Sequence, residues 1–400
     1  MKPLIKSSLA KELILANLPA ISAIDCPLDK CAGRILRQSI ASDRPMPPFD
    51  RSMMDGFALD AAFAEAGKVF KVVANVPAGM PQTSIGNEPN SCAEIMTGAI
   101  LPLGADCVVP YEDTERISES EIRIIDQEPI HQGDFVHKEG SDFASGEILI
   151  EPGSTLGSRE IAVAASCGYA TLKVSKMPSI AIACSGDELV EVDIVPESHQ
   201  IRRSNDYAIE TGLARAQLSA SVRTHLPDDI SAAKSQLIKL IRENTFIILS
   251  GGISMGKKDF IPGILEEQDL KCHFHGVAQR PGKPMGFWSN SRCAVFALPG
   301  NPLSTLTCLH HYVIPALRKA MTLAQDAPSF SVTLTKSEKV RPQLTVFLPV
   351  TIQDNNQALP CPPQNSGDLV RILQSDGYIE VPVGEDEAKA GQSYPFNPWY

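Results

Sequence analysis

The sequence predicts a multidomain protein of the α/β and β classes, in which a central domain carries a doubly wound, mostly parallel sheet. Between residues 178 and 326, apolar runs of strand length alternate with stretches of helical length, which is typical of βαβ units. Residues 46–142 and 327–400 instead contain short β-like runs separated by Gly, Pro and Asn turns. The 400 residues also exceed what one hydrophobic core normally supports, so several domains are expected.

Composition shifts divide the chain into five segments. An elongated arm is expected from residues 1–45 and again from residues 143–177, on either side of a small mostly-β domain at residues 46–142. The α/β domain follows at residues 178–326, and residues 327–400 are expected to form a small β-barrel, with a sandwich as the alternative. Pro45, Pro47 and Pro48 exclude regular helix at the first boundary, because proline lacks the amide hydrogen that a helix needs.

The individual elements follow from periodicity and from their end signals. Asn301 followed by Pro302 predicts a helix start, because Asn is a favoured N-cap and Pro is favoured at the first helical position. Residues 26–36, CPLDKCAGRIL, predict a turn and a short helix before a strand. Helices are expected at residues 7–18, 158–166, 205–216, 229–243, 261–268 and 302–320. Strands are expected at residues 70–73, 121–125, 179–184, 220–226, 246–250, 293–298, 332–335, 345–352 and 378–383.

Charge and cysteine content exclude several classes of protein. The formal net charge is −11 and no Lys/Arg run is present, which argues against nucleic acid as a partner. No apolar run reaches the length of about 18 residues that a membrane-spanning helix needs, so no membrane partner is expected. Ten cysteines occur without a C-x-x-C pair, which suits reduced thiols. We therefore expect a soluble cytoplasmic protein.

Three distinctive loops follow predicted strands of the α/β domain. They are SGDE at residues 185–188, GGISMG at residues 251–256 leading to Asp259, and PGNP at residues 299–302. If the strands are parallel, their carboxyl ends meet at one edge of the sheet, which is where open α/β sheets bind ligands. Glycine-rich loops ahead of helices can offer backbone N–H groups to a phosphate or another oxyanion. Plain turn chemistry is the alternative for each loop taken alone.

Carboxylates also gather at these predicted strand ends. Asp187, Glu188, Asp228 and Asp259 lie at or just past a strand, and carboxylate oxygens are the ligands that Mg²⁺ prefers. For Asp228 the alternative is a helix N-cap, because it precedes the helix expected at residues 229–243. Asp55-Gly56 is expected to form a tight turn in the mostly-β domain.

Basic residues cluster around the RPGKP loop at residues 280–284. Lys271, Arg280 and Lys283 give an acidic chain a local positive charge that could hold an anionic ligand. A solvated turn is the alternative. No P-loop, dinucleotide fingerprint or nucleophile elbow occurs in the sequence, so no covalent nucleophile is identified.

Six motifs in order, together with a C-terminal GYIEVPVGEDEAKAGQSYPFNPW, resemble the MoeA family of molybdopterin molybdenumtransferases, which is related to the E domain of gephyrin. The resemblance extends over nearly the whole chain. Its motifs are PPFDRSMMDGFAL (47–59), EIMTGAILPLGADCVVPYEDTE (94–115), SGDELV (185–190), SGGISMGKKDF (250–260), RPGKPMGF (280–287) and LPGNPLSTL (298–306).

This resemblance implies an activity and an assembly. It implies an enzyme of molybdenum cofactor biosynthesis that takes adenylylated molybdopterin and molybdate, depends on Mg²⁺, and releases AMP. It also implies a four-domain homodimer with an active site shared between subunits, and transient contact with other molybdenum-cofactor biosynthesis proteins. The central domain would be molybdopterin-binding-like.

The resemblance also implies roles for individual residues. Catalytic positions would be Asp55, Thr97, Asp142, Glu188, Asp228 and Asp259, and the last three would hold Mg²⁺. Gly251, Gly252, Ser254 and Gly256 would hold phosphate, and Arg280 and Lys283 would lie near anionic groups. The pterin pocket would be shaped by Pro299, Gly300, Asn301 and Pro302.

Two other functions are alternatives to this one. A molybdopterin adenylyltransferase has similar GGxSxG and PGNP loops, but the MDG and TGA motifs and the additional domains count against it. A non-catalytic pterin-binding scaffold would have no reason to retain all six catalytic positions, and all six are present.

Overall fold

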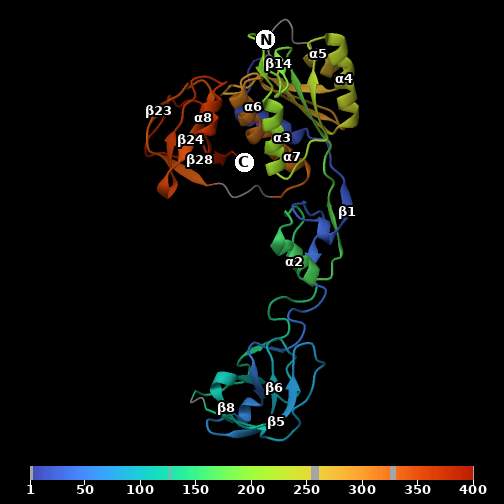
Figure 1. The fold of residues 1–400 in the computed structure, drawn as a ribbon, viewed down its shortest axis with the longest axis vertical. Coiled ribbons are helices and arrows are strands. Elements are labelled where there is room, and N and C mark those ends of the chain that lie inside the picture. The colour runs from blue at the N-terminus through green and yellow to red at the C-terminus, as the bar shows by residue number, and fades with distance from the viewer. Residues whose placement is uncertain (1–2, 126–127, 254–260, 325–329, 400) are drawn as a thin grey trace. The chain divides into compact units, whose positions relative to one another are not determined.

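The computed structural model describes residues 3–125, 128–253, 261–324 and 330–399 (Figure 1). Its contacts group into two compact units. Unit 1 comprises residues 1–37, 152–157 and 172–400, and unit 2 comprises residues 38–151 and 158–171. Each unit is described by itself, and the domain boundaries expected from the sequence stay predictions.

The centre of unit 1 is a six-stranded sheet with the order β16-β13-β17-β21-β20-β18 in the described chain. Four neighbouring strands are parallel, and the last two form an antiparallel edge. This confirms the mostly parallel α/β sheet. Their bounds are β13 Ile180–Ser185, β16 Val222–Leu226, β17 Phe246–Ser250, β21 Ala294–Leu298, β20 Gly286–Ser289 and β18 Lys271–His275.

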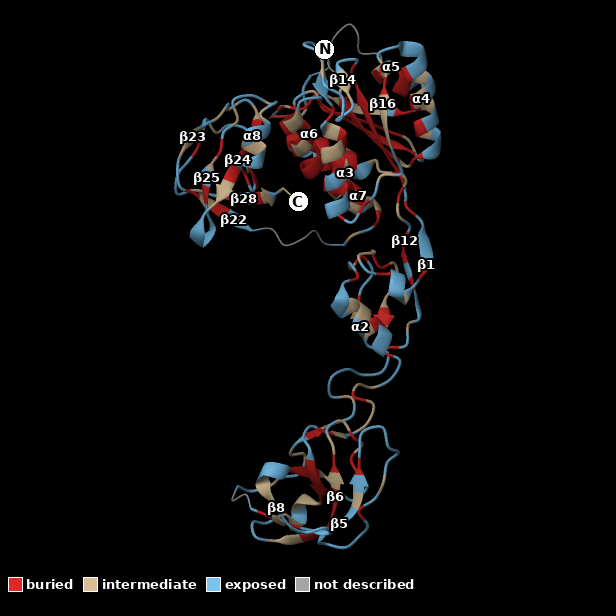
Figure 2. Cartoon of the chain, in the orientation of Figure 1, coloured by how far each residue is buried: buried red, intermediate tan, exposed pale blue. Residues whose placement is uncertain are grey.

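Helices cover both faces of this sheet, which makes it doubly wound (Figure 1). Phe246 and Ile248 of β17 pack into the core on one face, and Ile247 and Leu249 pack into the core on the other. Both faces of β17 are therefore buried, and its first four residues are apolar. Figure 2 shows that the strands of this sheet are largely buried. The first face is covered by α1 Ser7–Ala16, α3 Asn205–Arg215, α6 Pro302–Cys308 and α7 Ile314–Ala320, and the second by α4 Ile230–Glu243 and α5 Ile261–Glu267.

Two predicted helices differ from the structure at identifiable residues. The helix expected at residues 7–18 ends at Ala16, because Asn17 leaves helical geometry (φ −127°) and its Nδ2 donates to Leu13 O at 2.8 Å. The helix expected up to residue 320 contains a π-turn, η4 Leu309–Val313, between α6 and α7. Pro315 has no amide hydrogen to donate to the preceding turn, and such an insertion accommodates its absence.

The C-terminal residues of unit 1 form a closed five-stranded barrel. The strand order β24-β25-β22-β28-β26 closes through the pairing of β24 with β26, and apolar side chains fill the interior. The barrel prediction is therefore confirmed, and the sandwich alternative is wrong. The bounds are β22 Ser331–Leu334, β24 Thr345–Ile352, β25 Gln357–Pro360, β26 Gly377–Val381 and β28 Ser393–Pro398, with α8 Leu369–Leu373 beside them.

Unit 2 contains a second six-stranded sheet, with the order β7-β4-β6-β5-β9-β8 in the described chain. It is antiparallel except where β5 meets β6, and apolar clusters cover both faces. This confirms a mostly-β fold for the segment. The bounds are β4 Gly56–Leu59, β5 Val69–Val76, β6 Ser91–Ile95, β7 Cys107–Pro110, β8 Thr114–Ser118 and β9 Glu121–Ile124, and unit 2 also holds α2 Ser158–Ser166.

Short pairings complete the two units. Residues 26–36 form a 3₁₀ turn, Leu28–Lys30, followed by isolated bridges at Ile35 and Leu36 in place of the expected helix and strand. No helix in the described residues is long and apolar enough to cross a bilayer. The paired short strands are β1 Ala23–Pro27 with β12 Thr171–Ser175, β2 Ile40–Ala41 with β11 Ile148–Ile150, β3 Arg51–Ser52 with β10 Val136–His137, β14 Leu189–Val190 with β15 Ile201–Arg202, and β23 Glu338–Lys339 with β27 Glu387–Ala388, while β19 Gln279–Arg280 pairs with β24.

Candidate functional site

A pocket of about 1310 Å³ lies at the carboxyl ends of β13, β17 and β21 in unit 1. Because these strands are neighbours and parallel, the three loops expected to converge do so. Eight of the sequence-predicted residues line this pocket: Glu188, Asp228, Gly251, Gly252, Pro299, Gly300, Asn301 and Pro302. Ser254, Gly256 and Asp259 lie outside the described residues.

Both glycines after β17 lie close to neighbouring segments of the chain. Gly251 has φ +88°, and a Cβ atom there would lie 2.5 Å from Ser185 O. Gly252 has φ +65°, and its Cβ would lie 2.6 Å from Ile261 Cδ1. The Gly251 N–H donates to Leu298 O at 3.1 Å, so this N–H serves the sheet and is not directed at a ligand. The pair therefore brings two loops together at the pocket.

Asp228 is held toward the SGDE loop rather than used as a helix cap. It accepts from the Ser185 hydroxyl (3.4 Å) and the Asp187 N–H (3.3 Å), while its own N–H donates to Asp187 Oδ1 (3.1 Å). The N-cap of α4 is the next residue, Asp229, whose Oδ1 accepts from Ala232 N at 2.7 Å. The N-cap alternative for Asp228 is therefore wrong. Asp228 lines the pocket together with Asp187 and Glu188.

The PGNP turn is fixed by contacts that the sequence did not predict. Asn301 occupies the N-cap position of α6, but its side chain makes no capping bond and donates instead to Ser366 Oγ. Ser366 O in turn accepts from Leu303 N at 3.1 Å. The segment after Ser366 thereby reaches the pocket, where Gly367 and Leu369 contribute to the lining. No sequence motif marked this segment as part of a site.

Asn205, at the first position of α3, is a second residue that the motifs missed. Its Nδ2 donates to Ser250 Oγ at 2.9 Å and to Gly300 O at 2.7 Å. One amide therefore joins the end of β17 to the PGNP turn and fixes the spacing between two walls of the pocket. Asn is common at helix starts because it caps the helix, so its position in the sequence alone does not indicate a functional role.

The basic loop is placed differently from the other predicted residues. Among the described lining residues, Pro284 comes from this loop, but Arg280 and Lys283 do not. Arg280 is exposed and belongs to β19, which pairs with β24 of the barrel. The described lining takes its positive charge instead from Arg202 and Arg203, in the segment before α3, which the sequence did not single out.

In unit 2 the predicted residues form two polar pairs. Asp55 Oδ1 accepts from the backbone N–H and the hydroxyl of Thr97, at 2.6 and 2.7 Å. These two bonds, the backbone one first, hold the pKa of Asp55 below its ordinary value, so its carboxylate is ionised. His137 Nε2 lies 2.9 Å from Asp142 Oδ1.

The glycine beside Asp55 has a different purpose from the one expected. A Cβ atom on Gly56 would lie 2.1 Å from Val109 O, so glycine permits the close approach of β4 and β7. Gly56 is itself the first residue of β4. The expected tight Asp55-Gly56 turn is therefore replaced by a close strand contact, because the glycine is needed for space.

Comparisons with known proteins extend over the whole chain. Three family models match in order: the MoeA N-terminal region (domains I and II) at residues 5–168, a probable molybdopterin binding domain at residues 181–319, and the MoeA C-terminal region (domain IV) at residues 331–399. A molybdopterin molybdenumtransferase from Synechocystis sp. is 36% identical over 99% of this chain and 100% of its own. The chain belongs to the MoeA family.

Other members of the MoeA family support the same assignment. A molybdopterin molybdenumtransferase from Staphylococcus aureus is 26% identical over 96% of this chain and 93% of its own length. The crystal structure of a molybdopterin biosynthesis MoeA protein from Pyrococcus horikosii superposes with a TM-score of 0.82, at 27% identity and with all of both chains covered. The family's fold therefore matches both units described above.

Proposed function

We propose that this MoeA-family chain is a molybdopterin molybdenumtransferase, which inserts molybdenum from molybdate into adenylylated molybdopterin and releases AMP. The observation that carries the proposal is the pocket itself, in which three carboxylates and three strand-end loops share one lining. A nucleotide-bearing pterin is a large ligand, and a pocket of about 1310 Å³ has room for it. The names of the full-length relatives support the same reaction.

We further propose that the reaction uses Mg²⁺. Asp187, Glu188 and Asp228 supply hard oxygen donors to one pocket, and the hydrogen bonds to Asp228 are long, at 3.3 and 3.4 Å. Such donors suit a divalent cation that also binds phosphate oxygens. When bound, Mg²⁺ would neutralise negative charge on the phosphoanhydride that is cleaved. Among the described residues no group of three or more metal-binding side chains stands close enough to form a complete protein cage. Asp259, which the family resemblance groups with Glu188 and Asp228 as a Mg²⁺ ligand, lies outside the described residues.

The residues of the pocket would act by binding and orienting the substrate. Asn205 holds the PGNP turn against β17, which fixes the surface on which the pterin would lie. Asp187 and Asp228 hold one another through backbone N–H groups, so the carboxylate wall has a defined position before substrate arrives. Preorganised charge of this kind lowers the barrier for a reaction in which phosphate charge develops.

The reaction is tested by AMP release. Purified full-length protein should release AMP from adenylylated molybdopterin only when molybdate and Mg²⁺ are both present. Asp228→Asn should reduce that rate by about 10-fold or more and raise the Mg²⁺ concentration needed for half-maximal activity. Asp229→Asn is the matched control. It removes one negative charge at the adjacent position, and Asn can still cap the helix. AMP release without molybdate, or equal rates in both variants, would refute the assignment.

We also propose a homodimer that works in the cytoplasm. The scattered cysteines without C-x-x-C pairs suit a reducing compartment. Light scattering should give twice the chain mass of 43.2 kDa. The shared active site and transient contact with other molybdenum-cofactor biosynthesis proteins remain expectations of the family resemblance.

A further inference from the structure

The positive charge in the described pocket lining comes from two adjacent residues in different surroundings. Arg202 is exposed, and its Nε donates to Ile194 O at 3.0 Å. Arg203 keeps only 9% of its side-chain exposure. Burying a guanidinium costs several kcal/mol unless its charge is compensated. The groups around Arg203 therefore decide what it can do.

Asp206, at the second position of α3, provides that compensation. Its carboxylate is fully buried, and Oδ2 lies 3.1 Å from Arg203 Nη2. Glu191, which is half exposed, lies 3.0 Å from Arg203 Nη1. Both terminal nitrogens of Arg203 are thus engaged, whereas its buried Nε has no hydrogen-bond partner in the described structure. A buried N–H donor without a partner is costly, and it retains the capacity to bind a ligand.

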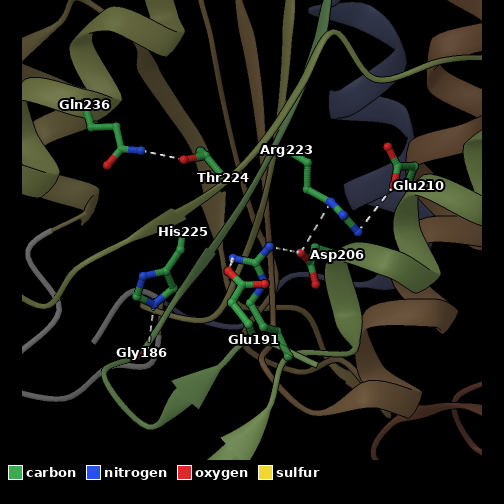
Figure 3. A network of polar contacts seen from close by, with 9 residues as sticks. Gly186, Glu191, Asp206, Glu210, Arg223, Thr224, His225 and Gln236 are labelled. Carbon is green, nitrogen blue, oxygen red and sulfur yellow. Dashed lines mark hydrogen bonds and ion pairs between the residues drawn. The ribbon is translucent and has the colours of Figure 1, made fainter. Parts of the chain in front are cut away.

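A second arginine, Arg223, adds a positive charge to this group. Arg223 Nε lies 3.8 Å from Asp206 Oδ2 (Figure 3). The Arg223 guanidinium also lies 3.8 Å from the ring centroid of Tyr207. Arg203 and Arg223 pair with three carboxylates, those of Asp206, Glu191 and Glu210, so the formal charge of the group is −1. Among these carboxylates only that of Asp206 is fully buried. Glu191 and Glu210 are both about half exposed. Water therefore screens their negative charge more strongly than that of the buried Asp206.

The same segment is tied to the remaining walls of the pocket. Asn205, between Arg203 and Asp206, bonds to Ser250 and Gly300. His225 Nε2 lies 2.9 Å from Gly186 O, which fixes the loop that carries the carboxylates (Figure 3). The pocket therefore combines a fixed acidic loop, suited to a cation, with a fixed guanidinium, suited to a phosphate oxygen.

We infer that Arg203 binds a phosphate group of the nucleotide-bearing substrate, and that Asp206 is the positioning residue that holds Arg203 in the pocket. The identity of that substrate rests on the proposed function. Because Nη1 and Nη2 of Arg203 form ion pairs with Glu191 and Asp206, the Nε–H group is the donor that remains for a phosphate oxygen. The planar guanidinium fixes the direction of this donor, which a lysine ammonium cannot reproduce. Arg203 is a binding residue in this scheme, and Asp206 acts only through it.

AMP and adenosine are the probes, since they differ only in the phosphate. Titration calorimetry uses the full-length protein in EDTA, so that no divalent cation contributes. The wild type should bind AMP about 10-fold or more tighter than adenosine. Arg203→Met should abolish that preference, Arg203→Lys should restore part of it, and Asp206→Asn should weaken AMP about 3- to 10-fold with adenosine unchanged. Arg242→Met removes an exposed arginine from α4, outside the lining, and should leave both affinities unchanged.

A purely structural role would give a different pattern. If the Arg203 and Asp206 variants unfold at lower temperature yet keep the wild-type preference for AMP, or if the wild type shows no such preference, the inference is overturned. Should Arg203→Met fail to fold, the Arg203→Lys and Asp206→Asn ratios decide the matter. Arg203-dependent AMP binding without molybdate-dependent AMP release would keep this inference and refute the proposed function. Normal AMP release with affinities insensitive to Arg203 would do the reverse.

Discussion

Replacing Gly251 by alanine would place a methyl group against the backbone of the neighbouring loop. The new Cβ would lie 2.5 Å from Ser185 O, at a backbone φ of +88°. An L-residue in this region costs about 1–2 kcal/mol, and a contact with atoms that cannot move aside adds about 1–3 kcal/mol. We therefore expect unit 1 to lose about 2–5 kcal/mol of unfolding free energy. Gly300 provides the matched variant, because its Cβ would lie 3.6 Å from its nearest neighbour, Gly251 Cα. Gly300→Ala should change stability by less than about 1 kcal/mol.

Tryptophan fluorescence can report this difference without interference from unit 2. The chain has two tryptophans, Trp288 and Trp399, and both belong to unit 1. Trp288 is fully buried in the α/β sheet. In a Trp399→Phe background it is therefore the single fluorescent tryptophan, and it lies in the domain that carries the pocket. In urea titrations the Gly251→Ala midpoint should fall well below that of Gly300→Ala, with the slope unchanged. Equal midpoints would refute the steric argument.

Three further perturbations follow from the same structure. Thr97→Val removes one of the two hydrogen bonds to Asp55, so the pKa of that carboxyl should rise toward its ordinary value in an NMR titration. Thr97→Ser retains the hydroxyl and should keep the pKa low. Equal pKa values in the two variants would show that the hydroxyl does not lower the pKa of Asp55. Burial lowers the pKa of His311 from 6.5 to about 3, so its stabilising contribution is complete above pH 6.5 and is lost as the pH falls toward 3. The urea midpoint of unit 1 should therefore drop between pH 7 and pH 5, and His311→Phe should flatten that dependence; an equally steep curve would contradict it. Finally, a thiol reagent at pH 8 should label Cys272 well ahead of the nine buried cysteines. Burial raises the thiol pKa to about 12 for Cys92, Cys107, Cys184 and Cys293. Rapid labelling of several thiols in the native protein would contradict this burial.

Most of the α/β fold was predictable because each of its elements carries its own signal. Strand β17 has the predicted bounds, since a run buried on both faces is almost entirely apolar and ends here at a glycine pair. The failures occur where tertiary contacts override local preference. Asn301 occupies an N-cap position, but its side chain donates a hydrogen bond to Ser366 Oγ instead of capping the helix. The residues near Asn301 in the sequence give no indication of this distant partner. Gly56 has the sequence of a turn, but a neighbouring strand needs the space.

The candidate site divides in the same way. The glycine loops and Asp228 were found because parallel strands bring their carboxyl ends together, which is a property of the fold class. Arg203 and Asp206 were missed because their significance lies in burial and in a contact with Arg223, from another strand. An arginine in a sequence of this kind is by default a solvated surface residue. Only the structure distinguishes Arg203 from its exposed neighbour Arg202.

That distinction bears on how a chain of net charge −11 can accept anionic substrates. At physiological ionic strength exposed charges are screened beyond about 8 Å, so the distant acidic surface repels a phosphate only weakly within the pocket. Buried groups are screened much less, and Arg203 and Asp206 are both buried. The buried pair of Arg203 and Asp206 therefore influences a bound phosphate more strongly than distant exposed carboxylates do. The local electrostatics of the pocket depend on which charges are buried. The net charge argues against nucleic acid as a partner, but it does not describe the electrostatic potential inside the pocket.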